Sequence, residues 1–173
     1  MEMFVNKVAA SGIQTLDLAP YCEPEIIGFD LQPHLFRGLI LKEKDFREAL
    51  KTIDLQPFTG KQVAVYCSVD AIVPVWAYAL VAVVLHPVAA GVHFGVEAAI
   101  RDAVIAATIR REIDPTQYEG ARLVLKGCGD VNIPPAAYIA ATDLLQPVVQ
   151  SLMFGEPCST VPLYKKKAAP AAG

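Results

Sequence analysis

Charged side chains are scarce in this sequence. Of its 173 residues, 19% are Asp, Glu, Lys or Arg and 54% are hydrophobic, whereas charged residues usually make up about 25% of a soluble domain. The net charge of −3 provides no basic surface for nucleic acid, so we expect no nucleic-acid partner. The composition predicts either a large core or an apolar surface that a partner covers.

Charge is missing altogether from residues 71–92, a stretch long enough to suggest a membrane span. Pro74, His86, Pro87 and Gly91 interrupt this stretch, which argues against a span. The N-terminus also lacks the basic segment followed by an apolar segment that marks a secretory signal. We therefore expect a soluble cytoplasmic protein that does not enter a membrane.

Cysteines are few and widely separated: Cys22, Cys67, Cys128 and Cys158. This spacing differs from the dense pattern of small disulfide-stabilised secreted proteins. The sequence also contains no Cys-x-x-Cys pair, which is the usual signature of a metal site. The cysteines are expected to be free or ligating thiols in a reducing compartment.

What the sequence does contain is a repeat at a constant offset of 60 residues, expected over two copies at residues 46–95 and 106–155. Matching positions include Asp54 and Asp114, Gly60 and Gly120, Tyr78 and Tyr138, and Gly95 and Gly155. So many matches at one offset predict an internal duplication. A fainter echo links Asp30-Leu31-Gln32-Pro33 to Asp54-Leu55-Gln56-Pro57.

The repeat also bears on the uncharged stretch. Its counterpart, residues 134–149, carries Thr142, Asp143 and Gln146, which is typical of an amphipathic soluble helix. The uncharged helix, which contains Trp76, is therefore expected to be the most buried helix of a globular domain.

The predicted fold is α/β, with a mostly parallel sheet flanked by helices and a strand-helix-strand unit that occurs twice. We expect a single domain over residues 1–167, with an irregular or short-strand N-terminal extension at 1–30 and a disordered tail at 168–173. The expected strands are residues 39–41, 63–66, 92–94, 123–126 and 152–154, and the expected helices are residues 44–53, 73–85, 97–113 and 134–150.

Three cysteines follow predicted strands. Cys67 and Cys128 lie where a strand passes into a helix, and Cys158 comes just after the last strand. Ligands bind outside the carboxyl ends of parallel strands, and a helix N-terminus favours the thiolate. Cys67, Cys128 and Cys158, with Asp70 or Asp130 as a further ligand, are therefore candidates to hold zinc, iron or an iron–sulfur cluster.

Simpler roles exist for the same residues. Free cysteines often pack as small hydrophobic residues, so Cys67 and Cys128 can match each other for packing alone. Asp70 and Asp130 precede helices, where they can cap the helix or turn the loop. The sequence is thus compatible with a ligand role and with a structural role for each of these residues.

Three segments resemble a known family: residues 39–47, residues 73–78 and residues 155–165, the last of which reads Gly-Glu-Pro-Cys-Ser-Thr-Val-Pro-Leu-Tyr-Lys. They are similar to an uncharacterised bacterial family, the domain of unknown function 2480, over nearly the whole chain. The resemblance implies that genes of this family lie beside iron–sulfur assembly genes. It therefore implies iron–sulfur assembly proteins as partners. It assigns no residue a role.

Three functions from different classes fit these observations. The first is a thiol-based accessory protein that handles a metal, a cluster or sulfur through Cys67, Cys128 and Cys158. The second is a non-catalytic interaction module with structural cysteines, possible also as a homo-oligomer. The third is an α/β enzyme that acts on a small molecule at the same edge, and for it the sequence offers no obvious general base.

Overall fold

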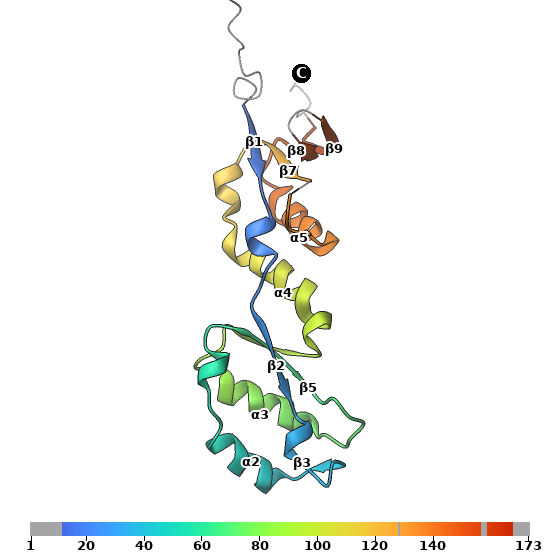
Figure 1. Cartoon of the computed structure of the whole chain (residues 1–173). Helices are drawn as coiled ribbons and strands as arrows, with labels where there is room; N and C mark the ends of the chain where they lie inside the picture. Colours follow the sequence, from blue (N-terminus) through green and yellow to red (C-terminus); the bar gives the residue numbers. More distant parts are fainter. Residues whose placement is uncertain (1–11, 128, 157–158, 168–173) are drawn as a thin grey trace, which may run out of the picture. The chain divides into compact units, whose positions relative to one another are not determined.

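The computed structural model describes residues 12–127, 129–156 and 159–167. Within these residues the chain forms α/β structure with four α-helices and mainly parallel sheets (Figure 1). The helices are α2 (Glu43–Lys51), α3 (Val75–Leu85), α4 (Glu97–Glu112) and α5 (Pro135–Leu145). The strands are β1 (Ile13–Leu16), β2 (Ile26–Asp30), β3 (Leu35–Phe36), β4 (Ile40–Leu41), β5 (Gln62–Tyr66), β6 (Gly91–Phe94), β7 (Arg122–Lys126), β8 (Ser151–Glu156) and β9 (Ser159–Lys165).

The chain divides into two compact units. We call residues 24–104 the central unit and residues 1–23 together with 105–173 the terminal unit. The central unit is thus an insertion within the sequence of the terminal unit, and the boundary on its C-terminal side falls within α4. Each unit is described by itself below.

The central unit contains a three-stranded parallel sheet in the order β2-β5-β6. Helices α2 and α3 supply Phe46, Leu50, Val81 and Leu85 to a core that also includes Val63 of β5. A smaller cluster forms around Ala64 of β5 with Ile100 and Val104. Because β5 is buried on both faces, it reads as a continuous apolar run rather than an alternating one.

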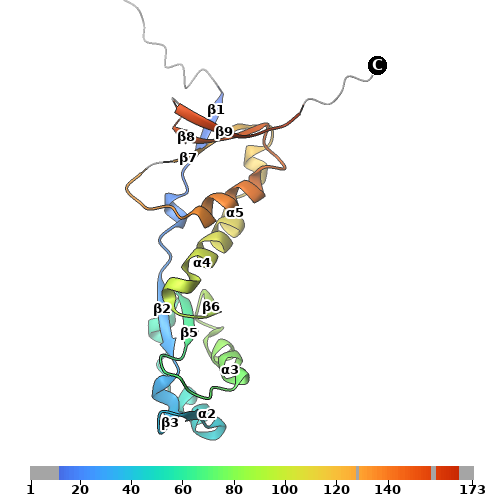
Figure 2. The same ribbon diagram turned by 90° about the vertical axis from the view of Figure 1, so that its right-hand side faces the viewer.

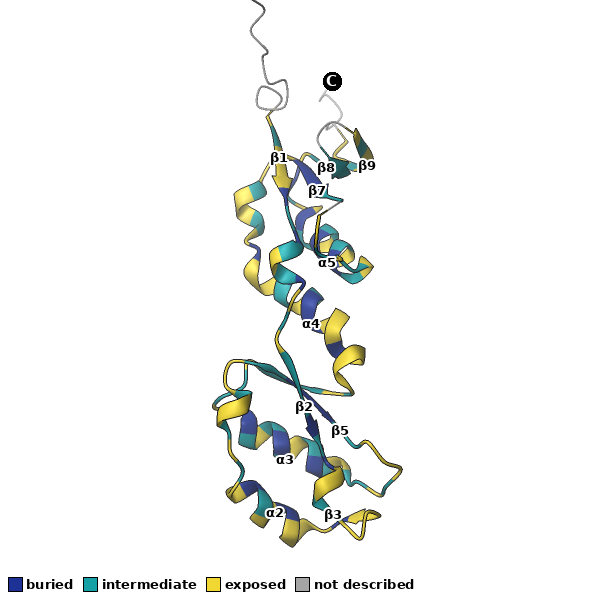
Figure 3. Cartoon of the chain, viewed as in Figure 1, coloured by how far each residue is buried: buried dark blue, intermediate teal, exposed yellow. Residues whose placement is uncertain are grey.

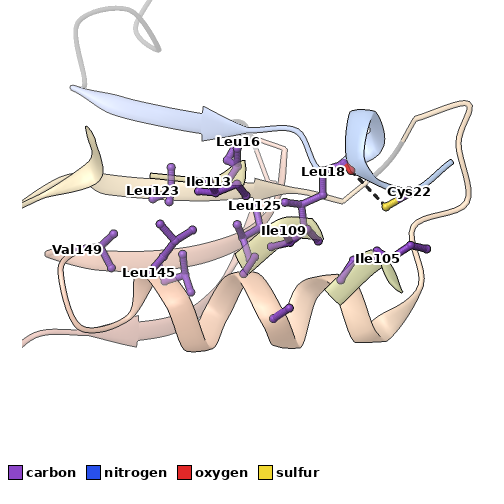
Figure 4. Packing of buried hydrophobic residues seen from close by; sticks show 14 residues of the cluster. Leu16, Leu18, Cys22, Ile105, Ile109, Ile113, Leu123, Leu125, Leu145 and Val149 are labelled. Atoms are coloured by element: carbon purple, nitrogen blue, oxygen red, sulfur yellow. Dashed lines mark hydrogen bonds between the residues drawn. The ribbon is translucent and has the colours of Figure 1, made fainter. Parts of the chain in front are cut away.

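The terminal unit contains a four-stranded sheet in the order β1-β7-β8-β9, in which only β9 is antiparallel to its neighbour. Its core joins Leu123 and Leu125 of β7 to Leu145 of α5 and to Ile105 and Ile109 of α4 (Figure 4). In Figure 2, α5 runs beneath the strands of this sheet. The alternation of strand, helix and strand produces this layered packing in both units.

The two units contain corresponding elements in the same order. Apart from β3 and β4 in the central unit and β9 in the terminal unit, the central unit runs β2, α2, β5, α3, β6, and the terminal unit runs β1, the second half of α4, β7, α5, β8. The turn before each middle strand contains a glycine with positive φ, 72° at Gly60 and 70° at Gly120. These glycines donate equivalent backbone hydrogen bonds to the carbonyls of Val88 and Val148, at 2.8 and 2.9 Å.

Two regions differ from the sequence expectation. Residues 1–30 were expected to form an irregular or short-strand extension, and they contain β1 and β2, which pair with β7 and β5 as members of the two sheets. Strand β9 was not expected, and Pro162 lies inside it. Proline lacks a backbone N–H and is confined to edge strands or irregular positions, and here it lies on an edge strand beside a register shift at Leu152 and Met153.

The expectation that the uncharged helix is the most buried helix is wrong, because α3 buries three residues and α5, which has the same length, buries four. Helix α3 buries only Ala77, Val81 and Leu85, while Val75 is 84% and Val83 is 69% exposed. Buried and exposed positions therefore alternate along α3, as Figure 3 shows. No helix in the described part of the chain is long and apolar enough to cross a membrane.

Candidate functional site

The carboxyl end of the central sheet is organised by Asp30, the last residue of β2. Its Oδ1 accepts hydrogen bonds from the backbone N–H groups of Gln32, at 2.9 Å, and Ser68, at 3.0 Å. The contact to Ser68 joins the end of β2 to the loop that follows β5. Asp30 therefore holds the loop in which Cys67 lies.

The pKa of Asp30 reflects two opposing effects. Burial raises it, but the hydrogen bonds from Ser68 and from the backbone of Gln32 stabilise the carboxylate and outweigh burial, so the pKa of Asp30 is lowered. The carboxylate is thus charged at neutral pH. It is engaged with the backbone of its own loops, which is a structural role.

Cys67 directly follows β5 and is a free, half-buried cysteine. It packs against the core of the central unit, as does Tyr78 of α3. The pKa of Tyr78 is raised, first by burial and then by the nearby Cys67 thiol. The ring of Tyr78 also makes an edge contact with Phe94, with ring centroids 5.2 Å apart.

The carboxyl end of the terminal sheet has an ion pair in the corresponding place. Asp17, which follows β1, receives a hydrogen bond at 2.8 Å from Lys126 Nζ, at the end of β7. The Asp17 carboxylate also accepts a bond from the backbone N–H of Ala19. The hydrogen bond from Lys126 is the main reason that the pKa of Asp17 is lowered.

An open cavity of about 550 Å³ lies beside this ion pair, at the loop between β7 and α5. Its volume is within the range of small-molecule sites, roughly 300–1,000 Å³. The cavity is lined by Gly127, Gly129, Asp130, Val131, Asn132, Ile133, Tyr138 and Phe154.

Close packing explains one of the glycines at this cavity. A Cβ atom at Gly127 would lie 2.9 Å from Phe154 Cζ and 3.1 Å from Gly155 Cα, which is too close for a side chain. The Tyr138 hydroxyl donates to the carbonyl of Lys126 at 3.0 Å and so fixes α5 to the end of β7. The close contact at Gly127 and the hydrogen bond of Tyr138 therefore hold two sides of the cavity in place.

The sequence-predicted site residues are distributed as follows. Cys67 and Asp70 belong to the central unit, and Asp130 lines the cavity of the terminal unit. Cys128 and Cys158 lie outside the described residues. The three-cysteine site stays a prediction, and no group of three or more His, Cys, Asp or Glu able to hold a metal ion occurs within the described residues.

Sequence reasoning missed Asp17, Lys126 and the role of Asp30. A signal was present, because Asp-Leu-x-Pro occurs at Asp17, Asp30 and Asp54. In each case the carboxylate accepts a hydrogen bond from the backbone N–H two residues later, at 2.9, 2.9 and 3.0 Å. This local turn is a known preference of Asp, and two of the three turns follow the first strand of a sheet.

The resemblance found in the sequence is confirmed over nearly the whole chain. The model of the family described as "Protein of unknown function (DUF2480)" matches residues 2–166. The chain belongs to the DUF2480 family. The match spans both units, so DUF2480 membership describes the two units together. No curated protein and no solved structure matches the chain.

Proposed function

We propose that this DUF2480 protein is a non-catalytic interaction module that docks other proteins on its central unit. The proposed docking surface consists of Val75, Ala79 and Val83 of α3 with Phe94 of β6, and we call it the α3–β6 surface. Val75, Val83 and Phe94 are 84%, 69% and 77% exposed. Large apolar side chains gathered at a surface usually mark an interaction site.

The observation that carries this proposal is the contrast between α3 and α5. The position that corresponds to Val83 in the terminal unit is Asp143, which forms an exposed ion pair with Arg110 at 3.4 Å. Helix α3 contains no charged residue at all. A surface helix normally has a polar outer face, so an apolar outer face on one of two corresponding helices supports a docking role.

Substitution on the outer face of α3 tests the proposal. Val83→Lys places a charge on the α3–β6 surface at an exposed position, where it leaves folding intact. A matched control is Ile139→Lys on α5, because Ile139 is 61% exposed. We expect the full chain to retain protein partners from a cell extract, the Val83→Lys variant to lose them and the Ile139→Lys variant to keep them. Equal retention by both variants would contradict the proposal.

A second candidate is the thiol-based function, in which Cys67, Cys128 and Cys158 bind zinc, iron or an iron–sulfur cluster for iron–sulfur assembly partners. The position of Cys67 at the carboxyl end of β5 favours it, because ligands bind at this end of parallel strands. Metal analysis of anaerobically purified protein tests it. Replacement of Cys158 by Ser should abolish binding of the metal or cluster. Replacement of the buried Cys22 by Ala is the control and should leave this binding unchanged.

We also propose that the two units arose by internal duplication. Support comes from the offset of 60 that relates β5, α3 and β6 to β7, α5 and β8, and Gly60 to Gly120. The contact of Tyr138 with Phe154 repeats that of Tyr78 with Phe94, at the same centroid distance of 5.2 Å. Superposition of residues 46–95 on 106–155 in an experimental structure tests this, and a different order of elements would refute it.

A further inference from the structure

An unpaired strand edge distinguishes the central sheet from the terminal one. In the terminal unit, β8 pairs with β7 on one side and with the antiparallel β9 on the other. The corresponding strand of the central unit, β6, pairs with β5, and within the described residues no strand pairs with its other side. Its free backbone groups are a template for an added strand.

The usual protections of such an edge are missing from β6. Its sequence, Gly-Val-His-Phe, contains neither proline nor a charged residue, and β6 pairs with β5 without a register shift. Phe94, at its end, is 77% exposed. Natural proteins normally blunt exposed edges with charge, proline or a bulge, so this edge is suited to pairing.

We propose that the occupant of this edge is a second copy of the chain, paired antiparallel through β6 to form a continuous six-stranded sheet across a two-fold axis. The proposal deepens the function proposed above, on which it rests. A two-fold axis perpendicular to the sheet keeps the faces of both sheets aligned, so that only residues of one face meet.

We consider the antiparallel register in which His93 of one copy lies opposite His93 of the other. In this register, residues from the same face of β6 lie opposite one another. It places Val92 opposite Phe94 of the second copy, an aromatic and β-branched pair of the kind that stabilises antiparallel strands. His93 itself lies on the other face, where its ring bonds to Gln62 Oε1 at 2.7 Å. The strand sequence is thus compatible with pairing to itself.

The helices fit the same arrangement. Helix α3 contacts both β5 and β6, and an axis above the midpoint of these two strands would lie about 2.4 Å inside β6. With strands about 4.8 Å apart across the two-fold axis, the two copies of α3 would lie about 10 Å apart. This is the upper end of the 8–10 Å range of ordinary helix packing.

The side of α3 that would face its copy carries small, apolar residues. Tyr78 contacts Phe94, and so marks the side of the helix towards β6. Val75 and Ala82, three residues before and four residues after Tyr78, lie on that same side. Val75 is 84% exposed, and alanine at position 82 permits the close approach of two helices.

Charge and area also favour a second copy. Residues 71–96 contain no Asp, Glu, Lys or Arg, so the two copies bring no like charges together, and a charged partner would find no counter-charge there. Phe94 alone offers on the order of 150 Å² of apolar surface. Val75, the alanines and the strand backbone add to this surface, and a specific interface needs about 1,000 Å² over both copies.

The test is sedimentation of the full chain over a roughly hundred-fold range of concentration around the micromolar range expected for so small an interface. We expect a monomer–dimer equilibrium. Phe94→Lys and Val75→Lys should each weaken the dimer at least roughly ten-fold, because each would bury an unpaired charge. Val161→Lys on β9 and Ile139→Lys on α5 are the matched controls, since both positions are exposed and lie in the terminal unit.

The outcomes separate this inference from the function on which it rests. A monomer at every concentration, or a dimer that Phe94→Lys and Val75→Lys do not weaken, overturns the second copy as occupant. If the monomeric chain still captures another protein and Val83→Lys abolishes that capture, the α3–β6 surface serves a different partner and the proposed function stands. Normal far-UV circular dichroism of each variant shows that loss of the dimer is not loss of folding.

Discussion

The central and terminal units use corresponding elements to make surfaces that differ in charge. Both place a helix after the middle strand, and both bury alanine and leucine at the same positions of that helix, Ala77 and Leu85 in α3, Ala137 and Leu145 in α5. The outer positions differ, since α5 bears Asp143 where α3 bears Val83. The inner face of a helix is thus dictated by its core, while the outer face is free to acquire a function.

The sheet edges differ in the same way. The terminal unit covers the outer side of β8 with β9, whereas no described strand covers β6. The two differences concern neighbouring elements of the central unit, since Tyr78 of α3 and Phe94 of β6 are in contact.

The largest expected effect concerns whether the two units unfold together. Phe46 is 1% exposed in the central core, and its replacement by Ala should cost about 3–5 kcal/mol. If residues 1–167 form a single cooperative domain, native-state hydrogen exchange will show weaker protection in both units. Loss of protection in residues 24–104 alone would mean that the units unfold separately.

A matched pair of glycines sharpens the comparison of the units. Gly60 and Gly120 have nearly equal positive φ values, and a Cβ atom added at either position would meet no other atom within 4 Å. Replacement of each by Ala should cost about 1–2 kcal/mol, because the left-handed conformation alone is penalised. Chemical denaturation measures both costs, and a difference larger than this penalty would show that the two turns are not equivalent.

Acid should weaken the central unit first. All three histidines, His34, His86 and His93, lie within residues 24–104. Burial lowers the pKa of His34 and of His93 below the ordinary value, so the unfolded chain binds protons at a higher pH than the folded one. The free energy of unfolding should therefore fall as the pH drops from about 6.5, the pKa of histidine in the unfolded chain, to the lower pKa of the folded state. Below the folded pKa, this contribution no longer changes with pH.

Hydrogen exchange at a series of pH values measures this effect. His34 stacks against Phe29 and meets Phe46 edge-on, so His34→Phe keeps an aromatic ring in place and should reduce the pH dependence. The amides of the terminal unit serve as the internal control. An equal acid response in both units would contradict the assignment to histidine, unless the Phe46→Ala experiment has shown that the units unfold together.

The smallest expected effect concerns the ion pair on the outer face of α5. The side chains of Arg110 and Asp143 are 49% and 66% exposed, and exposed pairs contribute at most about 1 kcal/mol. Asp143→Val, which gives α5 the residue found at Val83, should therefore change the free energy of unfolding by less than about 1 kcal/mol. A larger loss would show that the outer face of α5 is structural and that the contrast with α3 has another cause.

Much of the fold was predictable from local patterns. Strand β5 was expected at residues 63–66 and spans Gln62–Tyr66, and α4 was expected at 97–113 and spans Glu97–Glu112. These elements have continuous apolar runs or clear helical composition, which act over short distances along the chain. For β1 and β2 the sequence indicated only an irregular or short-strand extension, because their place in the sheets depends on pairing with the distant strands β7 and β5.

The candidate site was less predictable. The position of Cys67 at the end of β5 followed from the strand pattern alone. The bond from Lys126 to Asp17 joins residues 109 positions apart, and the bond from Ser68 to Asp30 joins residues 38 apart. Such contacts depend on strand order, which local periodicity does not specify.

By itself, the sequence determined the α/β class, the offset of 60 residues, the turns begun by Asp17, Asp30 and Asp54, and membership of DUF2480, because each depends on local composition or on matched positions. The tertiary structure alone decided which apolar residues are buried. Residues 71–92 are uniformly uncharged, so composition within this stretch does not distinguish Val81, in the core, from Val83, in solvent. Packing against the sheet and α2 made that choice, because a helix presents only one side to its core.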